Sequence, residues 1–128
     1  MAFQPLAEKI KNALIKLRSY TPDVDGIVLV DMNGLPIISI LPCSRDDSYV
    51  SAMAISILGT GQRTVDELKL GKLRKIVVQG ENGYVIFVAA GKDAVLAVLA
   101  TKISKLDIIL VDVALVAQNV AKILAERV

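Results

Sequence analysis

The sequence predicts an α+β domain in which one five-stranded antiparallel sheet is covered by helices on both faces. Turns that contain glycine separate apolar runs at three places, as in antiparallel hairpins. These runs are apolar on nearly every residue, so something must cover each face of the sheet. Three segments with helical spacing can supply that cover. The predicted order is helix, strand, strand, helix, strand, strand, strand, helix, in a single domain spanning residues 1–128.

The first helix is predicted from about Pro5 to Arg18. Its lysines and its arginine lie outside an apolar stripe with helical spacing. Pro5 stands where a proline in the first turn costs nothing. The stripe consists of Phe3, Leu6, Ala7, Ile10, Leu14 and Leu17.

The first hairpin is predicted over Gly26–Ser39 and turns at Asn33-Gly34, because Asn-Gly readily takes the positive φ angles of a tight turn. Glu81-Asn82-Gly83 and Gly91-Lys92-Asp93 mark two more turns. The remaining strands are predicted over Arg74–Gln79, Tyr84–Ala90 and Ala94–Ala100.

The second and third helices are predicted to begin with the same capping device. Ser44 and Asp47 stand three residues apart, and Ser104 and Asp107 repeat that spacing. The core stripe of the second helix is predicted to be Val50, Met53, Ala54, Ile57, Leu58, Gly61, Val65 and Leu68. The inner face of the third is predicted to be Leu106, Ile109, Leu110, Val113, Ala117, Val120 and Leu124.

The composition is 54% hydrophobic but only 4% aromatic, as expected for a membrane protein or for a subunit that buries surface in an oligomer. We predict no transmembrane segment, because a spanning helix needs about 18 consecutive apolar residues and Asp112 interrupts the C-terminal run. The N-terminus does not resemble a signal peptide. The single cysteine, Cys43, favours a reducing compartment, so we expect a cytoplasmic protein. A net charge of +2 is too small to suggest nucleic acid.

The order of segments, the strand-turn-strand unit Gly26–Ser39 and the run from Glu81 through Leu99 resemble the Roadblock/dynein-light-chain family, in its prokaryotic, MglB-like branch. The resemblance covers essentially the whole chain, and its motifs are structural rather than catalytic. It implies a homodimer whose sheets join edge to edge, with the second helices paired on one face. It also implies a platform for Ras-like small GTPases or a subunit of a motor or signalling scaffold.

The residues offer no catalytic constellation. The chain has no histidine, and one cysteine cannot form a zinc site. Gly71-Lys72 and Gly91-Lys92 lack the pattern of a phosphate-binding loop. We therefore predict a protein that is not an enzyme and has no catalytic residues, no cofactor and no metal.

The second helix carries the most suggestive surface. It is rich in small residues, and an interior glycine costs about 0.5–1 kcal/mol relative to alanine. The close approach of another backbone would compensate that cost. The alternative is a helix that ends at Gly59, with Gly59–Thr64 as a loop. An uncharged second stripe suggests burial on two sides, and with its neighbours it gives the predicted partner-binding residues Ser48, Ser51, Ala52, Ile55, Gly59, Gln62 and Arg63.

Two further surfaces are singled out. The dimer is predicted to join along one edge strand, because a long apolar edge left open invites aggregation. The basic group Lys69, Lys72, Arg74 and Lys75 either meets an acidic partner or a membrane surface, or is a solvated loop and strand start. The predicted joining edge is Leu73, Arg74, Lys75, Ile76, Val77, Val78 and Gln79.

Two classes of function remain. The first is a homodimeric platform that binds and regulates a Ras-like GTPase without itself being an enzyme. The second is an enzyme or small-molecule sensor on a similar three-layer fold, which the missing chemistry disfavours. A third possibility is that the protein assists GTP hydrolysis by supplying an arginine, Arg63 or Arg45, to the active site of the GTPase in trans.

Overall fold

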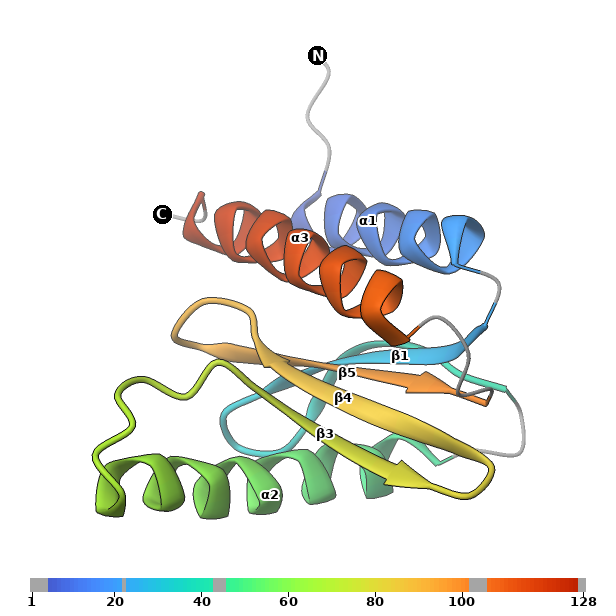
Figure 1. Cartoon of the computed structure of the whole chain (residues 1–128). Helices are drawn as coiled ribbons and strands as arrows, with labels where there is room; N and C mark the ends of the chain where they lie inside the picture. Colours follow the sequence, from blue (N-terminus) through green and yellow to red (C-terminus); the bar gives the residue numbers. More distant parts are fainter. Residues whose placement is uncertain (1–4, 22, 43–45, 102–105, 127–128) are drawn as a thin grey trace.

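The computed structural model describes residues 5–21, 23–42, 46–101 and 106–126. Figure 1 shows three layers, with α1 and α3 on one face of the sheet and α2 alone on the other. The predicted fold class and element order are confirmed. The elements are α1 (Leu6–Tyr20), β1 (Val24–Asp31), β2 (Pro36–Ile40), α2 (Asp47–Glu67), β3 (Lys75–Gly80), β4 (Gly83–Ala89), β5 (Ala94–Ala100) and α3 (Leu106–Ala125).

The sheet has the strand order β2-β1-β5-β4-β3, and every neighbouring pair is antiparallel. The two central pairings join β1 to β5 and β5 to β4, and β2 and β3 form the edges. The hairpin between β3 and β4 closes at Gly80, which pairs with Gly83. The strand that sequence reasoning assigned to the joining edge is therefore an edge strand, and its outer side is open in the described structure.

The first hairpin turns where predicted, but by a different device. Gly34 takes a positive φ of 83°, whereas Asn33 does not take a positive φ. The carboxylate of Asp31 accepts hydrogen bonds from the backbone N–H groups of Asn33 and Leu35. The turn is thus held by an aspartate side chain rather than by a two-residue Asn-Gly turn.

Helix α2 begins later along the chain than the predicted capping box implies. Its N-cap is Asp46, whose side chain accepts from the N–H of Ser48 at 2.9 Å. Asp47 instead accepts a hydrogen bond from the hydroxyl of Ser39 at 2.7 Å, which ties α2 to β2. The other predicted capping residues, Ser44 and Ser104, lie outside the described residues, as do Phe3, Cys43 and Arg45.

Helix α2 runs without interruption through both of its glycines, so the alternative of a loop over Gly59–Thr64 is wrong. Gly61 fits closely against the sheet: a Cβ built there would lie 2.6 Å from Cδ1 of Ile76. The absence of a side chain at this position lets α2 approach the start of β3. Packing on the sheet compensates the intrinsic cost of glycine in the helix.

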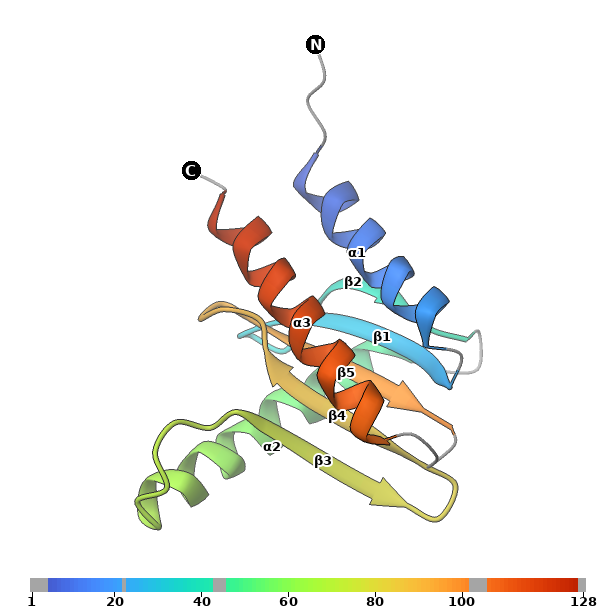
Figure 2. The same ribbon diagram turned by 45° about the horizontal axis from the view of Figure 1, so that its top comes forward.

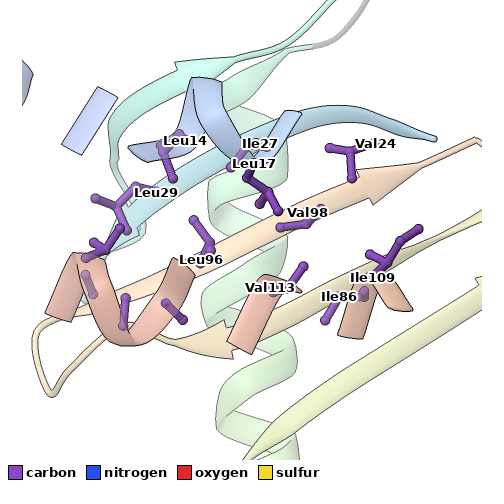
Figure 3. Packing of buried hydrophobic residues seen from close by; sticks show 14 of the residues in the cluster. Leu14, Leu17, Val24, Ile27, Leu29, Ile86, Leu96, Val98, Ile109 and Val113 are labelled. Atoms are coloured by element: carbon purple, nitrogen blue, oxygen red, sulfur yellow. The ribbon is translucent and has the colours of Figure 1, made fainter. Parts of the chain in front are cut away.

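The central strands are buried on both faces, as their continuous apolar sequence predicts. Ile27 and Leu29 of β1 pack towards α1 and α3, whereas Val28 and Val30 pack towards α2. Figure 3 shows the larger cluster, in which residues from β1, β4 and β5 meet residues of α1 and α3. The cluster beneath α2 is smaller, with Val28, Val30, Val50, Ala54, Phe87, Val95 and Ala97 as its buried members.

Helix α3 lies beside α1 and contributes five buried residues to the domain. The hydroxyl of Thr21 donates to Asp112 at 3.4 Å, and Lys9 and Glu126 form an ion pair at 3.5 Å. By length and composition alone, α3 could cross a membrane, and it is the single such helix in the described ranges, with mean hydropathy 1.9. A helix that packs in a core passes the same test, so this property by itself assigns no membrane role.

Candidate functional site

Helix α2 is the single helix of the described chain on its face of the sheet, opposite α1 and α3 (Figure 2). It contacts β1, β2 and β5, and its C-terminal half approaches the start of β3 at Gly61. Two apolar hollows flank it, one on each side. We call them the edge groove and the cationic groove.

The edge groove lies between α2 and the outer strands β3 and β4, with a volume of about 490 Å³. None of the described residues that line it is charged. Ala52, Ser56 and Thr60 stand four residues apart and form a row of small side chains on its helical wall. The full lining is Tyr49, Ala52, Met53, Ser56, Ile57, Thr60, Val78, Val85 and Phe87.

The predicted joining edge lies directly beside this groove. Residues 75–79 belong to β3, whereas Leu73 and Arg74 precede the strand. Ile76 and Val77 are half-buried, and Lys75, Val78 and Gln79 are exposed. Val78 lines the groove, so the open strand edge and the uncharged hollow form one continuous surface.

The cationic groove lies on the other side of α2, with a volume of about 410 Å³. There α2 faces the β4–β5 turn and the segment that leads into β3. Among the described residues that line it, three are cations and none is acidic. The lining is Met32, Ile55, Leu58, Gly59, Gln62, Lys72, Leu73, Arg74, Ala89, Gly91, Lys92, Ala94 and Val95.

The predicted partner-binding residues divide between these surfaces. Ile55, Gly59 and Gln62 line the cationic groove, and Ala52 lines the edge groove. Ser51 is fully buried, and its hydroxyl has no hydrogen-bond partner among the described residues. Ser51 therefore belongs to the interior of the domain rather than to an accessible surface. The remaining members, Ser48 and Arg63, are exposed.

The two glycines of α2 have different surroundings. A Cβ at Gly61 would press against Ile76 and Leu73 of its own chain, whereas a Cβ at Gly59 would meet no atom within 4 Å. The neighbours of Gly61 are side chains of its own domain rather than the second backbone that sequence analysis expected, so that expectation stays a prediction. At Gly59 the helix surface is open.

The predicted core stripe of α2 is partly wrong. Val50 and Ala54 are buried, but Met53 is 45% exposed and Leu68 is 64% exposed. Met53 faces the edge groove, where no element of the described chain covers the sheet. Helical periodicity identifies apolar positions, but it cannot tell a position on the domain's own core from one on an uncovered groove.

Sequence reasoning missed most of the residues of the edge groove. Tyr49, Val85 and Phe87 reach it from a helix and a strand that are far apart along the chain. The predicted binding surfaces include Ala52 and Val78, whereas the predicted core stripe includes Met53 and Ile57. Lys92 was missed as a partner of Lys72 and Arg74, because the turn that carries it is distant in sequence.

The described residues contain no group of three or more side chains that could hold a metal ion. Burial raises the pKa of the Tyr84 phenol above 10.0, and the charge of Asp23 raises it further. Tyr84 lies on the sheet face opposite α2, remote from both grooves, and its hydroxyl has no described hydrogen-bond partner. The raised pKa of Tyr84 follows from its place in the core and does not mark a reactive site.

Comparison with known proteins agrees with this architecture. The profile of the Roadblock/LC7 domain matches residues 10–100. Two uncharacterized proteins of Methanocaldococcus jannaschii, MJ0310 and MJ1340, are each 33% identical over 95 residues, covering 74% of this chain and 82% of the relative.

Solved structures extend the similarity of fold across nearly the whole chain. MglB of Myxococcus xanthus superposes with a TM-score of 0.87 at 16% identity, covering 100% of this chain and 96% of that one. The gliding protein MglB of Thermus thermophilus gives 0.85 at 15% identity, with 98% and 96% covered. With the family profile matching most of its length, this chain belongs to the Roadblock/LC7 domain family.

Proposed function

We propose that this protein is a cytoplasmic, homodimeric platform that binds and regulates a Ras-like small GTPase without being an enzyme itself. The observation that carries the proposal is the uncharged edge groove, which continues into the open edge of β3. Such a surface is incomplete in one chain. A second copy of the same chain can complete it symmetrically.

The dimer would pair β3 of one protomer with β3 of its partner and extend the sheet. The partner's α2 would then lie over the edge groove. The small side chains of Ala52, Ser56 and Thr60 would permit close packing of the two helices. The exposed apolar groups of Met53 and Val78 would be removed from water.

The GTPase would meet the outward surface of the paired helices. Ile55, Gly59, Gln62 and Arg63 remain the proposed contacts, together with Ser48 at the N-terminal end of α2, whereas Ala52 would face the helix of the partner protomer. Two observations support these contacts. The residues lie on or beside the exposed surface of α2, and the chain resembles a family whose members act as platforms for small GTPases. A nucleotide-dependent contact would bury about 600–1,000 Å² per partner and would be tighter for one nucleotide state.

Regulation through binding is favoured over catalysis supplied in trans. Arg63 is exposed on α2, and no described carboxylate holds it in place. A catalytic arginine must be positioned at the transferring phosphate. We therefore expect Arg63 to contribute contact rather than chemistry.

Light scattering at micromolar concentration tests the dimer. The wild type should give twice the chain mass of 13.7 kDa. Val78→Lys should shift the protein to monomer, because it places a charge in the edge groove. The matched control is Val111→Lys on the exposed face of α3, which should leave the dimer intact. A monomeric wild type, or equal effects of the two variants, would overturn the assembly.

A further inference from the structure

The cationic groove gathers its charges by folding rather than from one basic run. Lys72 and Arg74 lie in the segment between α2 and β3, and Lys92 lies in the β4–β5 turn. Lys75 pairs with Val88, so the chain just before β3 runs beside the chain just after β4. This pairing brings the three cations to one end of the sheet.

The described charged side chains that line the groove are all positive. The part of its lining that the structure describes contains no aspartate or glutamate, and no described carboxylate forms an ion pair with Lys72, Arg74 or Lys92. All three cations are exposed. Cations placed on separate segments around a hollow raise the local concentration of a negatively charged partner.

The floor of the groove is apolar. Val95 is buried, and Leu58, Ile55 and Leu73 are half-buried. At Gly59, no atom lies within 4 Å of the position that a Cβ would take, so the groove is open beside the helix there. An apolar floor inside a cationic rim selects a ligand that carries an apolar group next to negative charge.

We propose that this groove binds an acidic peptide segment of a partner protein, with an apolar side chain seated on Leu58 and Val95 and carboxylates placed on Lys72, Arg74 and Lys92. The inference rests on the proposed role as a platform, and it names the chemistry that a partner presents. It does not require that the partner be a GTPase.

Other anionic partners fit the groove less well. A membrane surface would need several apolar side chains that project, whereas Leu58, Leu73 and Val95 lie recessed and Met32 is the one exposed large apolar side chain in the described lining. Single-stranded nucleic acid binds by stacking bases on aromatic side chains, and no aromatic residue of the described ranges lines this groove. A peptide can place its backbone along the groove and alternate apolar and acidic side chains between the floor and the rim.

The test is a selection of random peptides, about 12 residues long, displayed on phage against the full chain. In parallel, the selection is run against the triple variant Lys72→Glu, Arg74→Glu, Lys92→Glu. Peptides from the wild type should be enriched in sequences that place Asp or Glu beside Leu, Ile or Phe. The triple variant should not enrich them. Enrichment without acidic residues, or the same peptides from both proteins, overturns the proposal.

The strongest selected peptide is then measured by fluorescence anisotropy. Arg74→Glu and Lys92→Glu should each weaken it about tenfold, and added salt should weaken it further, because the contacts are exposed charges. Lys11→Glu and Lys16→Glu make the same charge change on α1, across the sheet, and should have no effect. Equal loss in all four variants would show attraction to net charge only and would overturn the site.

A second arm titrates dodecanoate, which carries one carboxylate and an apolar chain. If dodecanoate binds in a manner sensitive to Arg74→Glu while no acidic peptide is selected, the occupant is a small amphiphile and the peptide proposal is wrong. The two proposals also fail separately. If acidic peptides bind but no GTPase does, the proposed function alone is overturned. If no acidic peptide is selected and GTPase binding persists in the triple variant, this inference alone is overturned.

Discussion

Substitution of the two glycines of α2, which stand two residues apart, should change the stability of the protein in opposite directions. Gly59→Ala should stabilise the protein, because the added Cβ meets no atom within 4 Å and the helix loses the intrinsic penalty of glycine. That penalty is about 0.5–1 kcal/mol. For a domain of this size the melting temperature should rise by about 2–5 °C.

Gly61→Leu should have the reverse effect. A Cβ there lies 2.6 Å from Cδ1 of Ile76 and 3.4 Å from Cδ2 of Leu73, and the rest of the leucine has to fit between α2 and the start of β3. Overpacking of this kind costs about 1–3 kcal/mol. Gly59→Leu is the matched control, since it adds the same side chain to the open surface of the same helix.

The assay is urea unfolding followed by circular dichroism at two protein concentrations, so that a contribution from dimerisation is seen as a dependence on concentration. Equal stability of the two leucine variants would refute the assignment of Gly61 to the sheet-facing side. A concentration-dependent loss at Gly59 would refute the placement of the partner helix in the edge groove.

Three further predictions follow from particular residues. Asp46→Ala should cost about 1 kcal/mol in urea unfolding, because it removes the N-cap of α2; an unchanged midpoint would show that the cap contributes nothing. The raised pKa of Tyr84 means that the folded protein holds the phenol proton more tightly than the unfolded chain does. The free energy of unfolding should therefore decline as the pH rises above 10.0, and it should decline less steeply in Tyr84→Phe. Identical pH profiles of the two proteins would contradict this. Arg63→Ala should leave any GTP hydrolysis stimulated by this protein unchanged when GTPase binding is intact; its loss in a single-turnover assay would assign Arg63 a catalytic role.

The fold could be predicted from the sequence because its signals are local. The continuous apolar runs of β1 and β5 require cover on both faces, and β5 spans the predicted residues 94–100. Glycine-containing turns divide the runs, as at Gly34 and Gly91, which both take positive φ. The ends of elements were harder to predict: the spacing of Ser44 and Asp47 suggested a capping box, whereas Asp46 caps α2 and Asp47 accepts a hydrogen bond from Ser39.

The candidate site could be predicted only in part, because its grooves are made by residues that the sequence keeps apart. The helical spacing of α2 identified Ile55, Gly59 and Gln62 as a surface, and the structure places them on one groove. It could not show that Ser51, one position from Ala52, points into the interior. Nor could it show that Lys92 joins Arg74, since only the pairing of β3 with β4 brings them together.

In the proposed complex, paired α2 helices form the surface that meets a Ras-like GTPase. The most direct measurement is the affinity, by calorimetry, of the wild type, Ile55→Lys and Arg63→Glu for a small GTPase from the same organism, loaded with GDP or with a GTP analogue. Arg63 is exposed, so its variant keeps the test sound if the half-buried Ile55 proves necessary for folding. We expect tighter binding in one nucleotide state and a loss of affinity of about tenfold or more in the folded variants. Failure to bind in either state, or equal binding by wild type and both folded variants, would contradict it.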